Sequence, residues 1–361
     1  MDLMRDDIHE NDRIGALTFA STVWLGRMVF SAPPQRRRNL LNTRLRNVLL
    51  FASKFLVTSA CLWWLSRYVD LTAIRQSLTG FSLSIILVGV LLHVGAYVAG
   101  AVRWWYLFCY LAGPVRFGQV LPSYYLGVFF NNFLPTAYGG DLARSARLYV
   151  SGMSGNALVG SAVMDRLLGL ASVIAIGGVA LVFADVGPFS HLAWTVFAGG
   201  AVAVLLAAAL IAVPDWSRAL DSRYGRRWPR LSALLSGFLR YGKAPWLMLK
   251  AFLLSALNQL LVVAVFILLA READLGVTAL QLVTLLMLVF LVASLPVSLG
   301  GLGPREGALL ALLLPFGVEA PAVLAVSIAY LAVLWASALP GLFMFFVRVN
   351  QPAGEQSETK P

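Results

Sequence analysis

The sequence is poor in charged residues: only 12% of its 361 residues are Asp, Glu, Lys or Arg, whereas 59% are hydrophobic. Soluble domains carry about 25% charge, so this composition and a mean hydropathy of +0.79 exclude a soluble globular fold. The hydrophobic residues form several long runs, whereas a secretory peptide has one short run before a small-residue cleavage site. The sequence therefore predicts an integral membrane protein.

Metal ligands and nucleotide motifs are also scarce. The chain has 2 cysteines and 3 histidines, all widely separated. They argue against a disulfide framework and against a metal site. His93 lies in an apolar run and is expected to pack between helices. No G-x-x-x-x-G-K-[ST] motif occurs, so ATP hydrolysis is not expected. We expect no metal, no cofactor and no enzymatic activity.

The apolar runs predict an all-α polytopic membrane protein. A spanning helix needs about 20 apolar residues, and about six runs are long enough. They cover residues 48–65, 81–102, 157–183, 191–213, 246–270 and 321–347. Two further segments, 120–135 and 280–296, fall short of spanning, and each ends in a motif rich in proline and glycine.

These two motifs, at 133–144 and 294–305, repeat one another. Leu134, Pro135, Gly139, Gly140 and Arg144 recur at identical spacing as Leu295, Pro296, Gly300, Gly301 and Arg305. Basic residues cluster at 36–46 and 218–243, which places both loops in the cytoplasm. That placement requires both broken segments to be re-entrant hairpins that return to the side from which they enter. The hairpins then open on opposite sides, as an inverted repeat of the kind found in secondary transporters.

The motifs have the groups that an anionic ligand needs. Broken backbone at membrane depth is tolerated where protein or water surrounds it, so Gly139, Gly140, Gly300 and Gly301 are expected to line a cavity. Helix N-terminal amides at these breaks can bind an anion such as phosphate. Arginine adds a planar fork that bonds two phosphate oxygens. The expected headgroup-binding arginines are Arg144, Arg147, Arg166 and Arg305.

Three acidic residues are candidate charge partners or proton-coupling groups: Asp141, Asp165 and Glu306. Structural roles stay open. Asp141 is also suited to cap the returning helix, Asp165 with Arg166 to form a structural pair, and Arg147 to anchor the inner surface.

The stretches GVFFNNFLPTAYGGDLARSARLY (127–149), MDRLLGL (164–170) and LPVSLGGLGPREGALLALL (295–313) resemble the lysylphosphatidylglycerol synthase transmembrane region family, flippase-like integral membrane proteins. The resemblance runs over roughly residues 45–347 and implies that the chain binds or moves a polar-headed lipid. The positions carried over are Asn131, Pro135, Gly139, Gly140, Asp141, Arg144, Asp165, Arg166, Gly300, Gly301, Gly303, Arg305 and Glu306. The synthases continue into a soluble aminoacyl-transferase domain. This chain ends after the polar tail NQPAGEQSETKP, so aminoacyl transfer is not expected.

The leading functional hypothesis is a lipid translocator that binds the anionic headgroup of a phospholipid or polyprenyl-linked lipid between the hairpins. The alternatives are a membrane-embedded transferase acting on a lipid-linked substrate and a lipid-binding scaffold without transport. Membrane lipids are the expected partners. The net charge of +11 lies beside the inner membrane ends, so nucleic acid is not an expected partner, and a homodimer is left open.

The expected organisation has three parts. Residues 1–46 form a basic cytoplasmic segment with a candidate interfacial helix, 47–347 a single transmembrane domain, and 348–361 a disordered cytoplasmic tail. The expected location is a bacterial-type cytoplasmic (inner) membrane, with both termini in the cytoplasm.

Overall fold

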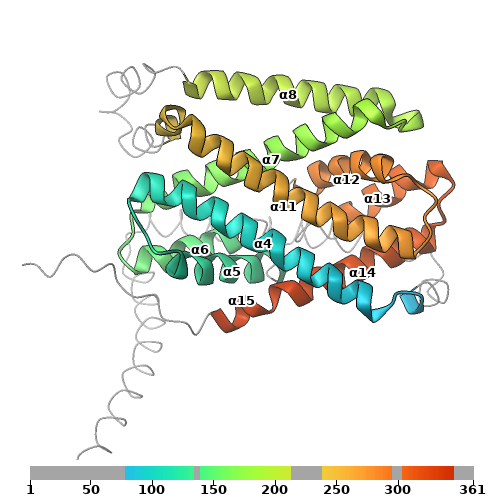
Figure 1. Ribbon diagram of the computed structural model, residues 1–361, viewed down its shortest axis with the longest axis horizontal. Helices are drawn as coiled ribbons and strands as arrows, with labels where there is room; N and C mark the ends of the chain where they lie inside the picture. Colours follow the sequence, from blue (N-terminus) through green and yellow to red (C-terminus); the bar gives the residue numbers. More distant parts are fainter. Residues whose placement is uncertain (1–77, 134–138, 213–237, 295–302, 345–361) are drawn as a thin grey trace, which may run out of the picture. The chain divides into compact units, whose positions relative to one another are not determined.

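The computed structural model describes residues 78–133, 139–212, 238–294 and 303–344, and every regular element among them is helical (Figure 1). All of them belong to one compact unit, Phe55–Pro361. The α-helices are α4 (Leu83–Ala112), α5 (Phe117–Phe133), α6 (Gly139–Val150), α7 (Gly155–Phe183), α8 (Ser190–Ala212), α11 (Pro245–Glu272), α12 (Ala279–Ser294), α13 (Pro304–Leu313), α14 (Ala320–Ala338) and α15 (Pro340–Phe343). Three short 3₁₀ helices are η1 (Gly187–Phe189), η2 (Arg240–Lys243) and η3 (Leu314–Phe316).

Five stretches of the described residues are helical, long and apolar enough to cross a membrane. They are Leu83–Ala112, Gly155–Phe183, Gly187–Ala209, Pro245–Glu272 and Ala320–Phe343, with mean hydropathies between 2.1 and 2.5. Each corresponds to one predicted span, so the prediction of an all-α polytopic membrane protein is confirmed. The predicted span at 48–65 lies outside the described residues.

Two spans differ from the expected boundaries. Helix α4 continues to Ala112, well past residue 102, and its added part buries Trp104, Leu107 and Phe108. Arg103 interrupts the apolar run, which is why hydropathy alone ended the span there. At the other end of the chain, α14 stops at Ala338 and α15 restarts at Pro340. Proline lacks a backbone N–H, which suits the first turn of a new helix.

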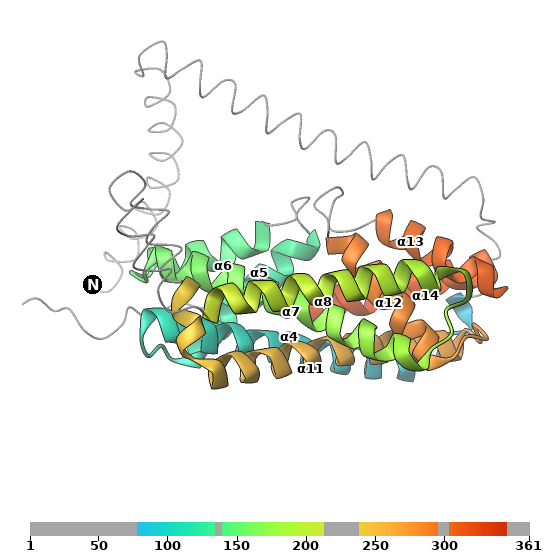
Figure 2. The same cartoon turned by 90° about the horizontal axis from the view of Figure 1, so that it is seen from above.

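The two segments that fell short of spanning form two pairs of short helices, α5–α6 and α12–α13. Their second members, α6 and α13, have 12 and 10 residues, which is about 18 and 15 Å of helix. Both are about half of the ~30 Å hydrocarbon core of a bilayer. Figures 1 and 2 both show the α5–α6 pair toward one end of the bundle and the α12–α13 pair toward the other.

Each pair is held by its own hydrophobic cluster. The first joins Trp104 of α4, Val120 of α5, Leu148 of α6 and Leu158 of α7, all at most 1% exposed. The second is built from buried residues of α7, α11, α12, α13 and α14, including Leu286, whose relative exposure is 0%. The long helices therefore serve as a shared frame against which both short pairs pack.

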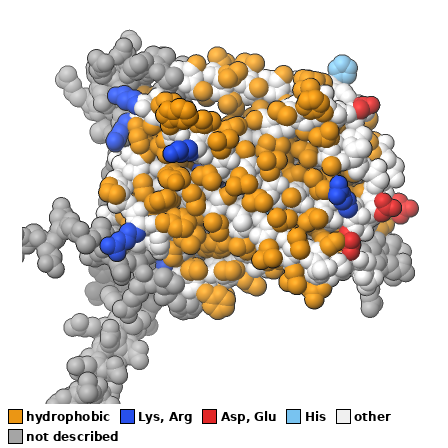
Figure 3. Space-filling view, in the orientation of Figure 1, with side chains coloured by type: hydrophobic (Ala, Val, Ile, Leu, Met, Phe, Trp, Pro, Cys, Tyr) orange, Lys and Arg blue, Asp and Glu red, His pale blue; other side chains and the backbone are white. Residues whose placement is uncertain are grey.

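Apolar side chains also cover the outside of the bundle. Helix α8 is the least covered span, with 11% of its most apolar window buried, and contains Leu205, which is 69% exposed. Figure 3 shows hydrophobic side chains across the middle of one face, with most Lys and Arg side chains toward one end and the acidic side chains at the other, where a basic side chain also lies. Such an apolar band between polar ends is what a bilayer requires.

The packing of α7 against α8 and α12 requires a glycine at 177. A Cβ atom there would lie 2.3 Å from ring atoms of Phe197 and 2.9 Å from Cβ of Met287, whereas at neighbouring Gly178 the nearest atom is 3.7 Å away. We expect Gly177→Ala to lower the free energy of unfolding by about 1–3 kcal/mol through overpacking. Gly178→Ala, the matched control, should be neutral or stabilising, since alanine favours helix by about 0.5–1 kcal/mol. Thermal unfolding of both variants in detergent tests this, and equal midpoints would contradict it.

Candidate functional site

Asp165 of α7 lies at the centre of a buried polar cluster and accepts hydrogen bonds from two arginines. Arg103 of α4 donates from Nε to Oδ1 at 2.6 Å, and Arg144 of α6 donates from Nη2 to Oδ2 at 3.1 Å. Arg103 also donates from Nη1 to Oγ of Ser255 in α11 at 2.7 Å. Side chains from four helices are therefore joined in one hydrogen-bonded cluster around Asp165.

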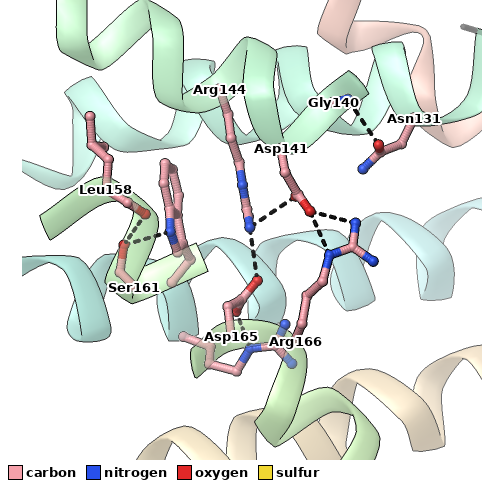
Figure 4. Close-up of polar contacts among 10 residues, drawn as sticks. Asn131, Gly140, Asp141, Arg144, Leu158, Ser161, Asp165 and Arg166 are labelled. Carbon is pink, nitrogen blue, oxygen red and sulfur yellow. Dashed lines mark hydrogen bonds and ion pairs between the residues drawn. The ribbon is translucent and has the colours of Figure 1, made fainter. Parts of the chain in front are cut away.

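Asp141, in the first turn of α6, extends the cluster toward the surface. Its Oδ1 lies 3.0 Å from Nη2 of Arg144, and its Oδ2 accepts a hydrogen bond of 2.5 Å from Nε of Arg166. Figure 4 shows the Arg144 side chain between Asp141 and Asp165, with Arg166 reaching Asp141 from α7. The cluster thus has two carboxylates in contact with three guanidinium groups.

The members differ in exposure. Arg103, Arg144 and Asp165 are 7%, 4% and 4% exposed, whereas the side chain of Arg166 is 44% exposed. A single charge at the centre of a membrane helix costs about 2.5–3.5 kcal/mol on insertion scales, so the buried members depend on one another. Arg166 is the cluster's accessible cation.

Arg144 is also held by aromatic rings. Its guanidinium carbon lies 4.3 Å from the ring centroid of Trp104 and 5.3 Å from that of Tyr124. The Trp104 indole is fixed in turn by donating Nε1–H to Oγ of Ser161 at 3.1 Å. Nε of Arg144 is buried and has no hydrogen-bond partner among the described residues, a deficit of about 1–3 kcal/mol.

A close contact between α5 and α6 positions Asp141 and Arg144. A Cβ atom at Gly140 would lie 1.9 Å from the carbonyl oxygen of Gly127, so only glycine permits this approach. The Gly140 N–H donates to Oδ1 of Asn131 at 2.9 Å. The sequence suggested that the N-terminal amides of α6 bind an anion. One of these amides, that of Gly140, is instead bound by the side chain of Asn131.

The cluster borders a cavity of about 410 Å³. Its lining includes all five charged residues of the cluster and, from α12, Phe290, Leu291 and Ser294. Asn131, Asn258 and Gln259 add uncharged polar groups. Both short helix pairs thus contribute residues to one polar cavity inside an otherwise apolar bundle.

Arg305 of the second motif and the adjacent Glu306 form a separate cluster, and neither lines this cavity. Arg305 donates from Nε to Oε1 of Glu306 at 3.0 Å, and Oγ of Ser327 donates to the same oxygen at 3.0 Å. The N–H of Gly303 donates to Oε2 of Glu306 at 2.7 Å. This pair is buried, with Arg305 and Glu306 7% and 8% exposed, and is neutral overall.

The structure therefore separates the predicted site residues into groups. Asn131, Asp141, Arg144, Asp165 and Arg166 line the cavity. Arg305 and Glu306 pair with each other, and Arg147 donates to the carbonyl of Met344 at 2.5 Å. Gly139 begins α6, whereas Gly300 and Gly301 lie outside the described residues.

Arg103, Ser255 and Gln259 are polar contributors that the sequence did not suggest. Arg103 follows a predicted span and resembles a flanking charge, and Ser255 and Gln259 are single polar residues within an apolar run. A helical wheel of 245–272 would have shown their common interior face, since they are spaced by four residues.

A bundle of apolar helices around a cation-lined cavity defines a polytopic all-α membrane protein with an internal polar site. A family model described as the lysylphosphatidylglycerol synthase TM region matches residues 51–341. The chain belongs to this family. Among curated proteins compared with the chain, none matches it.

Asp165 is expected to be essential for stability. Asp165→Asn leaves Arg103 and Arg144 buried without their carboxylate and should lower the free energy of unfolding by about 3–5 kcal/mol. Asp274→Asn is a matched control, because Asp274 is exposed and has a φ of 45°, which asparagine also tolerates. Thermal unfolding in detergent should show a large drop for the first variant alone. Equal midpoints would mean that the cluster does not stabilise the fold.

Proposed function

We propose that the protein is a lipid translocator whose cavity binds the anionic headgroup of a membrane lipid. The observation that carries this proposal is the charge of the cavity. Three arginines and two aspartates are the charged residues of its described lining, which leaves one positive charge in excess. An anion that contacts Arg166 and Arg144 would balance this charge through bonds that guanidinium groups make well.

A neighbouring apolar groove supports a lipid as the source of the anion. It measures about 670 Å³ and lies between α7, α8 and the start of α11. The groove shares Leu167, Leu170 and Leu291 with the polar cavity, so the two lie side by side. A polar cavity next to an apolar groove fits a ligand with a charged head and an acyl chain.

The charge distribution supports an orientation. Most of the exposed cations outside the cavity lie at the end where α4 stops and α11 starts: Arg116, Arg240, Lys243 and Lys250, whereas Arg271 is exposed at the opposite end. Exposed acidic residues lie at the opposite end: Asp185, Glu272, Asp274 and Glu319. By the positive-inside rule the first end faces the cytoplasm, and we infer that both termini do so in a bacterial-type inner membrane.

In this proposal, the α5–α6 and α12–α13 pairs are re-entrant hairpins, related as an inverted repeat and open to opposite leaflets. Asp141 links α6 to α7 through Arg166, with Oδ2 accepting the hydrogen bond. A lipid phosphate that takes over Arg166 competes with Asp141 and weakens this link. Headgroup binding would therefore loosen one hairpin from its neighbouring span, and alternation of the two hairpins would move the headgroup across.

Arg166 provides the sharpest test, because Arg144 and Arg305 are buried in ion pairs and their loss disturbs folding. Arg166→Gln should reduce the exchange of a fluorescent anionic phospholipid between liposome leaflets by about tenfold or more, since a charge-assisted phosphate contact contributes about 1.5–3 kcal/mol. Arg271→Gln, an exposed arginine at the end of α11, is the matched control and should retain exchange.

Wild-type protein should exceed empty liposomes in the same assay. If the wild-type protein binds the lipid but exchange is no faster than in empty liposomes, the protein is a lipid-binding scaffold and not a translocator. Equal exchange rates for Arg166→Gln and Arg271→Gln would show that Arg166 does not bind the headgroup.

The groove has its own test on α8. Ala203 lines the groove, whereas Ala201 on the same helix does not, and both are exposed. Ala203→Trp should fill the space for an acyl chain and reduce exchange several-fold, while Ala201→Trp should leave it unchanged. Equal rates for the two variants would place the acyl chain elsewhere.

A further inference from the structure

A second cavity adjoins the polar one and has a different chemistry. It measures about 350 Å³. It shares Tyr124, Val128, Asn131, Asn258, Gln259 and Phe290 with the charged cavity, so the two spaces adjoin. We call this second space the amide chamber.

The described lining of the amide chamber contains no Asp, Glu, Lys or Arg. Its polar members are His93, Tyr97, Tyr124, Asn131, Asn132, Asn258, Gln259 and Tyr330. Amide side chains present both donors and acceptors, and imidazole and phenol groups can do either. Such a lining matches hydroxyl groups, which also donate and accept, and offers no counter-charge to an ion.

Two side chains of the chamber have unused hydrogen-bonding capacity. His93 is 2% exposed, and its Nδ1 has no partner among the described residues. Its ring is held by edge contacts with Tyr97 and Tyr330, at centroid distances of 4.7 and 5.6 Å. The amide of Gln259 likewise has no hydrogen bond within the part of the chain that the structure describes. Gln259 is only partly buried, whereas Nδ1 of His93 is enclosed. Buried polar atoms rarely remain unpaired, so a hydrogen-bonding group that enters the chamber is expected to pair with this nitrogen.

We propose that the amide chamber binds the hydroxyl-bearing part of the lipid headgroup, so that the ligand is a phosphodiester lipid carrying a polyol or sugar. This rests on the proposed function, in which the phosphate contacts the arginines of the adjoining cavity. Hydroxyls reach the Nδ1 of His93 and the amide of Gln259, and the rings of Tyr97 and Tyr330 border the carbon skeleton of the polyol.

The test compares two lipids with the same acyl chains and the same single phosphodiester charge. Phosphatidylinositol carries a polyol, and phosphatidylmethanol carries none. We expect the wild-type protein in nanodiscs to bind phosphatidylinositol about tenfold more tightly in competition with a fluorescent lipid, because sites that hydrogen-bond a hydroxyl discriminate against analogues without it. Equal affinities for the two lipids would overturn the proposal, and water would then be the expected occupant of the chamber.

Variants separate the chamber from the anion site. His93→Leu, at a residue that lines the chamber alone, and Gln259→Leu, at a residue that lines both spaces, should each bring the ratio of the two Kd values toward one. Damage to the fold would weaken the binding of both lipids alike. His191→Leu, an exposed histidine outside the chamber, should keep the ratio. An unchanged ratio in both chamber variants would overturn the proposal. Failure of both lipids to bind the wild-type protein would instead contradict the proposed function.

Discussion

The fold depends on the pairing of ionised groups inside an apolar bundle. Asp165 forms ion pairs with Arg103 and Arg144 at once, and these residues come from α7, α4 and α6. The pair with Arg103 joins helices that are distant in sequence, and the pair with Arg144 joins α6 to the next helix, α7. Because an unpaired charge at this depth costs several kcal/mol, the cluster selects one arrangement of α6 among those that hydrophobic packing alone would permit. The same requirement makes α6 responsive to any ligand that changes the pairing.

Burial divides the cluster into a fixed part and an accessible part. Asp165 and Arg103 are enclosed, and their contacts are short and specific, which suits a structural role. Asp141 and Arg166 lie nearer the open cavity, where an incoming anion can exchange with a carboxylate. A site of this kind reconciles stability with function. The buried charges of Asp165 and Arg103, whose separation would cost the most free energy, stay paired throughout a binding cycle, and only the more hydrated pair of Asp141 and Arg166 has to change partners.

Sequence reasoning was most successful where the physical signal is long. Twenty-residue apolar runs predicted the five described spans, and the proline and glycine motifs predicted that two shorter apolar segments are broken. Helices α6 and α13 begin at Gly139 and Pro304, within these motifs. It was less successful for single polar residues. Nothing local distinguishes Arg103 from a flanking cation. Only the three-dimensional meeting of α4 with α7 shows that it pairs with Asp165. Contacts between distant segments determine which charges are partners, and one sequence does not reveal them.

The two repeated motifs illustrate how equal sequence patterns acquire different chemistry. In the second, Glu306 follows Arg305 directly and also accepts the N–H of Gly303, so the pair satisfies itself within the first turn of α13. In the first, the position after Arg144 is a serine, and Arg144 must find its carboxylates one turn earlier and on α7. A closed pair has little to offer a ligand, whereas a cluster that reaches across helices leaves a polar cavity at the junction. The position of a single glutamate thus accounts for why the proposed headgroup site lies beside α6 and not beside α13.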